Sequence, residues 1–522
     1  MSILSPLTTF LIGFIYHLKE LINKKKLKKI SKIKSVFIMS DPTTEIKKGS
    51  LEIPDRSTKK MVLFQLNIII GGILYTMWNR IQFFAVSLLL IPQITIVFIY
   101  LVYSIVDGIN DPIIGYLIDR SKRFTKRYGK RFPWIMIGTI AAPIFLILCF
   151  IPIVVVQVDS KGNVTDSNAV LIAALWLILL MCVYESFRTL AEVNLNALIP
   201  DMYRGEEQRR NLGFIGQIIG IISSLLGAIL IPLLLVVYGG VTSINAYIFT
   251  VISIVIISFV LMIPFSFGAR EPEDMKVFRA DLDEAGKGTS PVKEVVTRVL
   301  KDRNWMAFTF AVFFWAIAGM CLVAGLDFFI VHYLGLSYSA IIFPSLAAIG
   351  GGVLSIPIFM KIIKKLGAKK AYLTSIIMFA IFYFAFFFVE DIIELTIAFI
   401  FVGIASGGQG ITYIIVSSEA IDNSVLLSGK REEGTYNGIL RIFTGFSYVF
   451  QALIFATVSS YTGYIPAKGK NQTELARFGL KLQMSLIPMV IILIGIIIFI
   501  YFYNITKEDA LANKKKLLEM RL

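Results

Sequence analysis

Residues 92–118 read PQITIVFIYLVYSIVDGINDPIIGYLI, an apolar stretch long enough to cross a membrane but interrupted by polar side chains near its end. Asp107, Asn110 and Asp111 are spaced i, i+3 and i+4, so on a helix they project from one face. A carboxylate at membrane depth costs about 2.5 kcal/mol or more unless it meets a cavity, a partner or an ion. Two carboxylates one turn apart also repel each other unless a cation or proton intervenes. The stretch therefore predicts a helix with an ion-binding face; the alternative is a helix that ends outside the bilayer at Asp111-Pro112.

The composition of the whole chain favours a helical membrane protein. Its 522 residues are 56% hydrophobic and only 16% charged, more apolar than a soluble domain of this size requires. The apolar runs are continuous, which disfavours an outer-membrane β-barrel. Nucleic-acid binding is not expected from the net charge of +16, because the lysines and arginines sit mainly between the apolar runs. Three scattered cysteines and two histidines predict neither a disulfide framework nor a histidine-rich metal site.

Twelve apolar segments are candidate membrane spans. A polar connector separates the sixth from the seventh, which gives two halves of six helices each. We therefore expect an all-α, polytopic membrane protein. The candidate spans are 62–88, 92–118, 133–156, 169–198, 210–238, 243–267, 305–333, 338–363, 369–389, 392–418, 435–460 and 480–504.

The basic residues set the expected orientation. Residues 119–132 hold seven lysines and arginines, and residues 361–370 hold five. The loops expected on the other side of the membrane hold fewer basic residues. Because positive residues favour the cytoplasmic side of a membrane, both termini and these two loops are expected in the cytoplasm. The protein is expected to span a cell membrane. The N-terminal extension is either an interfacial anchor with a basic segment or a flexible tail with no role in transport. The expected divisions are the extension (1–60), a first bundle (61–268), a connector (269–304), a second bundle (305–504) and a cytoplasmic tail (505–522).

The fourth span carries a second group of polar residues. Arg188 has Glu185 at i−3 and Glu192 at i+4, so it can be neutralised within its own helix. Thr189, Glu192 and Asn196 share one face. Ionisable groups at this depth usually mark a pathway or a binding site. The alternative is a ladder of ion pairs that only satisfies its own members.

Charges expected inside the spans leave an excess of two carboxylates. A cavity among them should attract cations or keep some acids protonated. Arg80 and Asp327 have a second interpretation, in which they face the outer interface. The sequence contains no nucleotide-binding loop, zinc-protease motif or nucleophile elbow, so an enzyme is not predicted. The acids are Asp107, Asp111, Glu185, Glu192 and Asp327, and the bases are Arg80, Arg188 and Arg441.

Two motifs, one in each half, resemble a known family. Residues 107–115, Asp119-Arg120 and residues 129–134 (GKRFPW) are similar to the second-helix signature of the glycoside–pentoside–hexuronide:cation symporters, which belong to the major facilitator superfamily. Asp422 and residues 428–436 (SGKREEGTY) resemble the loop that this family carries before helix eleven. The resemblance covers about residues 61–505.

The resemblance implies a secondary transporter that couples Na⁺, Li⁺ or H⁺ to solute movement. The ion ligands it implies are Asp107, Asn110, Asp111 and Thr189, all hard oxygen ligands that suit an alkali cation. No cofactor other than the coupling ion is implied. The residues that match the family's cytoplasmic gating motifs are Asp119, Arg120, Arg131, Asp422, Arg431 and Glu433.

The substrate site carries over less completely. Glu192, beside Arg188, stands where the family has a sugar-binding aspartate, and Asn196 replaces an aromatic residue one turn later. By spacing, Gln217 replaces a fifth-helix arginine, and Arg441 is the only basic substitute for an eleventh-helix lysine. We therefore predict cation-coupled symport of a sugar or a related polar solute by alternating access. Alternatives are a lysolipid symporter and a non-transporting membrane receptor. The expected partners are the solute, the coupling cation and the lipid bilayer, and the chain is expected to be a monomer.

Overall fold

The computed structural model describes residues 56–120, 125–159, 164–203, 205–273, 275, 292–428 and 433–520. Almost all of them are helical, and twelve helical segments are long and apolar enough to cross a membrane. The predicted all-α fold with twelve spans is confirmed. Most of the predicted extension at residues 1–60 lies outside the described residues.

The helices of the first half begin where the sequence supplies capping side chains. The Ser57 hydroxyl accepts a hydrogen bond from the backbone N–H of Lys60, and the Asp166 carboxylate accepts one from Asn168. Such bonds satisfy N–H groups that a helix leaves free in its first turn. The helices are α3 (Thr58–Trp78), α4 (Ile81–Ser87), α5 (Gln93–Arg120), α6 (Thr125–Tyr128), α7 (Phe132–Cys149), α8 (Ser167–Met202), α9 (Glu206–Val237) and α10 (Ile244–Ala269).

The second half repeats this plan with more interruptions. Its seventh span passes from an α-helix into one π-helical turn, and its eleventh span is broken between Gly445 and Ser447. The helices are α12 (Val292–Lys301), α13 (Arg303–Phe328), η1 (Phe329–Tyr333), η2 (Tyr338–Ile341), α14 (Ile342–Leu366), α15 (Ala368–Phe386), α16 (Ile392–Ser428), α17 (Glu433–Gly445), α18 (Ser447–Thr462), η3 (Pro466–Lys468), α19 (Glu474–Met484), α20 (Leu486–Phe502) and α21 (Lys507–Met520).

Helix α5, which carries the predicted ion-binding face, is continuous. It runs through Pro112 as far as Arg120, so the alternative of a helix that ends at Asp111-Pro112 is wrong. A proline removes one backbone hydrogen bond from a helix. Packing against α8, α17 and α18 holds α5 in place. The carboxylates of α5 therefore lie within a helix and not at its end.

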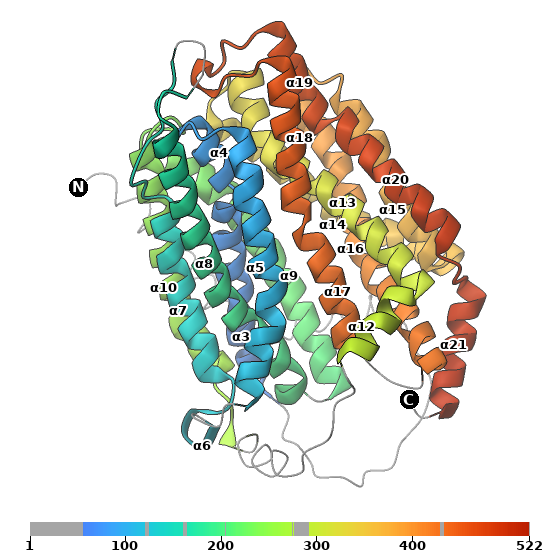
Figure 1. The fold of residues 1–522 in the computed structure, drawn as a ribbon. Coiled ribbons are helices and arrows are strands. Elements are labelled where there is room, and N and C mark those ends of the chain that lie inside the picture. The colour runs from blue at the N-terminus through green and yellow to red at the C-terminus, as the bar shows by residue number, and fades with distance from the viewer. Residues whose placement is uncertain are drawn as a thin grey trace.

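The two halves stand side by side and meet along two seams (Figure 1). One seam joins α5 to α17 and α18, and the other joins α9 to α14. The short helices α6, α12 and α21 lie at one end of the bundle, and α4 and α19 lie at the other (Figure 1). We call the first the basic end, because residues 127–131 and 361–370 lie there, and the second the opposite end.

A buried ion pair joins the two halves at the opposite end. Arg80, in the break between α3 and α4, bonds Asp327 near the end of α13, and the Tyr338 hydroxyl donates to the same carboxylate oxygen at 3.0 Å. Arg80 is 8% exposed and Asp327 is 0% exposed. Beside them the rings of Phe83 and Phe328 lie 4.9 Å apart. The interpretation that Arg80 and Asp327 face the outer interface is therefore wrong, since both are enclosed between the halves.

We expect Asp327→Asn to destabilise the protein strongly. The substitution leaves the guanidinium of Arg80 buried without its carboxylate, and such losses cost about 3–5 kcal/mol. The double variant Arg80→Gln/Asp327→Asn should recover part of this loss, because no bare charge remains. Thermal unfolding of the purified protein measures both effects, and a single variant as stable as the parent protein would contradict the assignment.

Glu390→Gln is the matched control for this experiment. Glu390 is exposed, and its carboxylate accepts a hydrogen bond from Lys481 at 2.5 Å. Hydrogen bonds from Lys481 and from Tyr333 lower the pKa of the Glu390 carboxyl. The small contribution of Glu390 to the free energy of unfolding is therefore present above the ordinary glutamate pKa. It is lost as the pH falls through the lowered pKa. Lys481 is buried but the Glu390 carboxylate lies in solvent, so loss of this pair should cost less than loss of the pair between Arg80 and Asp327, in which both side chains are buried.

Candidate ion and substrate site

Three helices bring six charged side chains together near the middle of the bundle. The sequence placed these residues on separate spans, and the seam between α5 and α17 joins them. We call them the charge cluster. They are Asp107 and Asp111 from α5, Glu185, Arg188 and Glu192 from α8, and Arg441 from α17.

Arg188 is held by both acids of its own helix, as its spacing predicted. Its Nε donates to Glu185 at 2.9 Å, a second nitrogen bonds the other oxygen of the same carboxylate, and Nη1 donates to Glu192 at 2.5 Å. A forked contact of this kind is among the strongest hydrogen-bonded pairs. Nη2 also lies 3.7 Å from Asp107, so the arginine connects α8 to α5.

Arg441 connects the second half to the same acids. Its Nη1 lies 2.9 Å from Asp111 and 3.5 Å from Glu192, and its Nη2 lies 3.9 Å from Asp107. The cluster thus sets four carboxylates against two guanidinium groups, so with all groups ionised it carries an excess of negative charge. The pair at the opposite end is neutral by itself and leaves this excess unchanged.

Two carboxylate oxygens in the cluster accept no hydrogen bond. Oδ1 of Asp107 and Oδ1 of Asp111 are both buried, and Asp107 as a whole is only 8% exposed. A buried acceptor without a donor is costly, and a cation or proton at this position would relieve the cost. Arg188 and Arg441 already balance part of the charge of these acids, and the described residues hold no group of three or more acidic, histidine or cysteine side chains placed to hold a metal ion. An alkali cation or a proton at α5 therefore stays a prediction.

The other two predicted ion ligands have protein partners. The hydroxyl of Thr189, fully buried, donates to Glu185 at 3.2 Å. The amide of Asn110 donates to the Ser186 hydroxyl at 3.2 Å. Both side chains lie at the contact between α5 and α8. The described contacts, however, do not bring all four predicted ion ligands together around one point. Their role as ion ligands stays a prediction.

Gly445 allows the second half to approach Asp107. A Cβ atom at Gly445 would lie 3.1 Å from Oδ2 of Asp107, and the Gly445 carbonyl accepts a hydrogen bond from Ser104 at 3.0 Å. A larger residue would push the carboxylate away. The sequence analysis named only Arg441, one turn earlier, in this part of the chain and did not foresee the contact at Gly445.

A cavity of about 230 Å³ lies beside the charge cluster. Asp107, Arg188 and Arg441 form its charged side. The sequence analysis missed the rest of the lining, because each aromatic residue belongs to a different apolar stretch and gives no signal alone. We call these residues the aromatic wall: Tyr75, Trp78, Tyr103, Tyr184 and Tyr448.

The five residues predicted for substrate binding divide into two groups. Arg188, Glu192 and Arg441 belong to the charge cluster. Asn196 and Gln217 are exposed side chains of α8 and α9 and do not line this cavity. Within the described residues no contact links either of them to the cluster, and their role stays a prediction.

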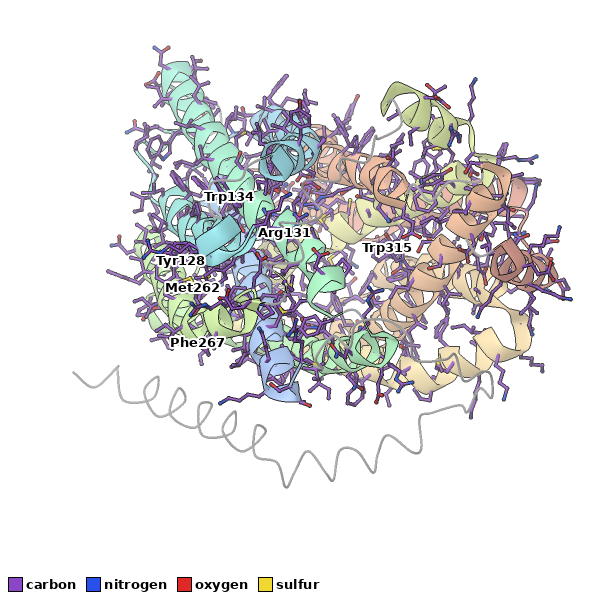
Figure 2. All side chains as sticks on the ribbon, turned by 90° about the horizontal axis from the view of Figure 1, so that it is seen from below. Tyr128, Arg131, Trp134, Met262, Phe267 and Trp315 are labelled. Carbon is purple, nitrogen blue, oxygen red and sulfur yellow. The ribbon has the colours of Figure 1, made fainter. Side chains whose placement is uncertain are left out.

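The predicted gating residue Arg131 lies where α7 begins. Its backbone N–H and that of Phe132 donate to one oxygen of Glu271, at 2.6 and 3.1 Å. Gly129, with φ of +98°, leaves room for this carboxylate, since a Cβ would lie 2.5 Å from its carbon. The Arg131 side chain also reaches Asn194 at 3.5 Å. Seen from the basic end, Arg131 lies over the first half (Figure 2). Glu271 was missed because it follows the sixth span.

The remaining gating residues are described only in part. Asp119 and Arg120 end α5, but their side chains lie outside the described residues, as does the whole of Arg431. Asp422 lies in the last turns of α16, and Glu433 begins α17, both at the basic end. These five assignments stay predictions.

Among the described residues, twelve apolar helices and a charged internal cavity give the architecture of a multi-pass membrane transporter. The chain belongs to the family of the major facilitator superfamily described as MFS/sugar transport protein, which matches residues 68–507.

The names of relatives in this superfamily refer to different solutes. Lactose permease of Lactobacillus helveticus is 29% identical over 139 residues, which are 26% of this chain and only 20% of the permease. Sodium-dependent lysophosphatidylcholine symporter 1-B of Danio rerio is 23% identical over 459 residues, 80% of each chain. The crystal structure of the nucleoside transporter NupG, 13% identical, matches with a TM-score of 0.58 over 86% of this chain and 99% of that one, which shows the shared fold.

We expect Arg188→Gln to destabilise the protein by about 3–5 kcal/mol, because it leaves the fully buried Glu185 without its guanidinium partner. Arg188→Lys should lose less, since it keeps the charge but not the forked contact. Arg210→Gln is the control, because Arg210 is exposed and lies 3.9 Å from Glu207. Denaturation of the three purified variants ranks them, and equal stability of Arg188→Gln and Arg210→Gln would contradict the role of Arg188.

Proposed function

We propose that the protein is a secondary symporter that couples a cation, Na⁺ or H⁺, to the transport of a sugar or a related polar solute. The observation that supports this most directly is the pair of buried carboxylate oxygens on Asp107 and Asp111 that accept no hydrogen bond. Asp327 also has a buried oxygen without a hydrogen bond, but its pair with Arg80 is neutral, whereas Asp107 and Asp111 belong to a cluster in which four acids face two arginines. A small cation that binds and leaves there would balance part of this negative charge.

Arg441 relates ion binding to the contact between the halves. It belongs to the second half, yet it bonds Asp111 of the first half at 2.9 Å. A cation bound between Asp107 and Asp111 brings positive charge to the same carboxylates and weakens their attraction for Arg441. The contact between α5 and α17 then changes with ion occupancy. Ion and solute thus affect each other's affinity through one shared site.

Alternating access requires that the two ends open in turn. With the basic end in the cytoplasm, as its lysines and arginines favour, the opposite end is the outer one. The buried pair of Arg80 and Asp327 then closes the outer side. Solute from outside enters only after this pair separates.

Lysolipid transport is the second candidate. The zebrafish relative named for sodium and lysophosphatidylcholine matches 80% of this chain. The aromatic wall suits an amphiphilic solute as well as a sugar ring. Counterflow in proteoliposomes separates these candidates: labelled sugar exchanges in one case and labelled lysolipid in the other. If neither labelled sugar, labelled lysolipid nor any other solute tested exchanges, a non-transporting receptor on the same fold is favoured.

We expect Asp111→Asn to reduce cation-stimulated uptake to the rate measured without a cation gradient. The amide keeps the size of the side chain but removes the charge that attracts the ion. Uptake into proteoliposomes with and without imposed Na⁺ and H⁺ gradients measures the effect. Glu519→Gln, an exposed carboxylate in α21, is the control and should leave uptake unchanged. Normal gradient-driven uptake by Asp111→Asn would refute coupling through this residue.

A further inference from the structure

We propose that an anionic phospholipid of the surrounding leaflet binds to a surface of lysines at the basic end of the second half. This lipid is a bound partner and not the transported solute. The surface belongs to other helices than the charge cluster, so the proposal does not rest on the proposed function. It forms where α14 ends and where α15 and α21 begin. We call it the lysine face, and it consists of Lys361, Lys364, Lys365, Lys369, Lys370 and Lys507.

The lysine face lies at the boundary of the membrane, because three candidate spans meet there. The eighth span ends at Leu366, the ninth begins at Ala368 and the twelfth ends at Phe502. Helix α21 then follows α20 at the basic end (Figure 1). The side chains of Leu366, Tyr501 and Phe502 are exposed beside the lysines. Aromatic and basic residues at the ends of spans lie at the level of the lipid head groups.

Two of the lysines hold the three helices together. The Nζ of Lys507 donates to the backbone carbonyl of Lys364 at 3.0 Å, and the Nζ of Lys369 donates to the carbonyl of Tyr503 at 2.5 Å. Gly367, with φ of +83°, lets α21 approach, since a Cβ there would lie 2.9 Å from the Cβ of Lys507. The lysines of α14, α15 and α21 therefore share one surface.

The positive charge of this surface is not balanced within the described residues. Residues 361–370 and 507–509 hold six lysines and two acids. None of the six lysines forms an ion pair with another described residue. Of the two acids, Asp509 is engaged by Thr506, whose backbone N–H and hydroxyl donate to it at 2.9 and 2.8 Å. Like charges gathered in this way repel one another, and an anion beside them relieves the repulsion.

The helix dipoles do not supply the missing negative charge. The last turn of α14 carries Lys364 and Lys365, and the dipole there is worth only about half an elementary charge. Helix α15 begins directly afterwards with its positive pole, carries Lys369 and Lys370, and has no acid in its first turn. The two dipoles thus oppose each other at this turn. The balancing anion has to come from outside the described chain.

The orientation of the protein in the membrane explains only part of this arrangement. Positive residues favour the cytoplasmic side, but that rule places no two lysines beside each other. At the matching place in the first half, the Arg131 side chain reaches Asn194 at 3.5 Å, whereas no described side chain neutralises the lysine face.

A phospholipid fits this surface better than a soluble anion does. Its phosphate meets the lysines, and its acyl chains cover the exposed apolar side chains at the ends of α14 and α20. On α14, Lys361 and Lys365 are one turn apart and project from the same face, so one head group can contact both. A soluble phosphate offers the charge alone.

Thermal unfolding of the purified protein in detergent tests the proposal. The added ligands are dioleoylphosphatidylglycerol, dioleoylphosphatidylcholine and glycerol 3-phosphate. The two lipids have the same chains and differ in net charge, and the third ligand carries a phosphate without chains. A ligand that binds only the folded state raises its apparent stability.

We expect phosphatidylglycerol to raise the melting temperature more than phosphatidylcholine does, and glycerol 3-phosphate to leave it unchanged. The extra shift should shrink in about 1 M salt, where charges are screened beyond about 3 Å. Equal shifts with the two lipids would overturn the proposal. An equal shift with glycerol 3-phosphate would also overturn it, because a soluble anion would then suffice.

Two double variants locate the lipid. Lys361→Gln/Lys365→Gln removes two exposed charges and leaves the backbone bond at Lys364 intact. It should raise the phosphatidylglycerol concentration needed for half of the shift roughly thirtyfold, because each lysine near anionic lipid contributes about fivefold in affinity. Lys468→Gln/Lys470→Gln, two exposed lysines at the opposite end, is the matched control and should leave this concentration unchanged. Equal effects of the two double variants would overturn the assignment to the lysine face.

A transport measurement keeps this proposal separate from the proposed function. Binding of phosphatidylglycerol at the lysine face without gradient-driven uptake of any solute would overturn symport and leave the lipid site standing. Gradient-driven uptake with equal shifts from the two lipids would leave symport standing and overturn the lipid site.

Discussion

The attraction of Arg188 and Arg441 for four carboxylates is the interaction on which the rest of the site depends. Four acids this close together, two of them buried, are tolerated only where opposite charge is close. Arg188 supplies it from the same helix as Glu185 and Glu192, and Arg441 supplies it from the other half. In this conformation these ion pairs hold α5, α8 and α17 together.

The backbone of α5 and α17 near the charge cluster allows these side chains to come together. Gly445, at the end of α17, lets the second half approach α5 without a side chain in the way. Helix α5 remains helical through Pro112, so the carboxylates of Asp107 and Asp111 keep the one-turn spacing that sets them on a single face. On the far side of the cavity the aromatic rings enclose a volume that the charged side alone could not define.

The sequence predicted what lies within one helix and missed what lies between helices. Span lengths and the i+3 and i+4 pairing of Arg188 depend on local spacing, so both were predictable. The partnership of Arg80 with Asp327 joins residues 247 positions apart, and periodicity gives no information on such pairs. The sequence analysis missed the aromatic wall for the same reason, because its residues come from four helices whose sequences are uniformly apolar. Glu271 was missed because a carboxylate just after a span resembles ordinary connector sequence.

The pair between Arg80 and Asp327 lies out of contact with water, and this has a consequence for the environments in which the protein can work. Dissolved salt screens exposed charges over about 10 Å at moderate ionic strength, but it acts much less on a pair enclosed by protein. Changes in salt concentration should therefore leave the ion pair that closes that end of the bundle almost unchanged.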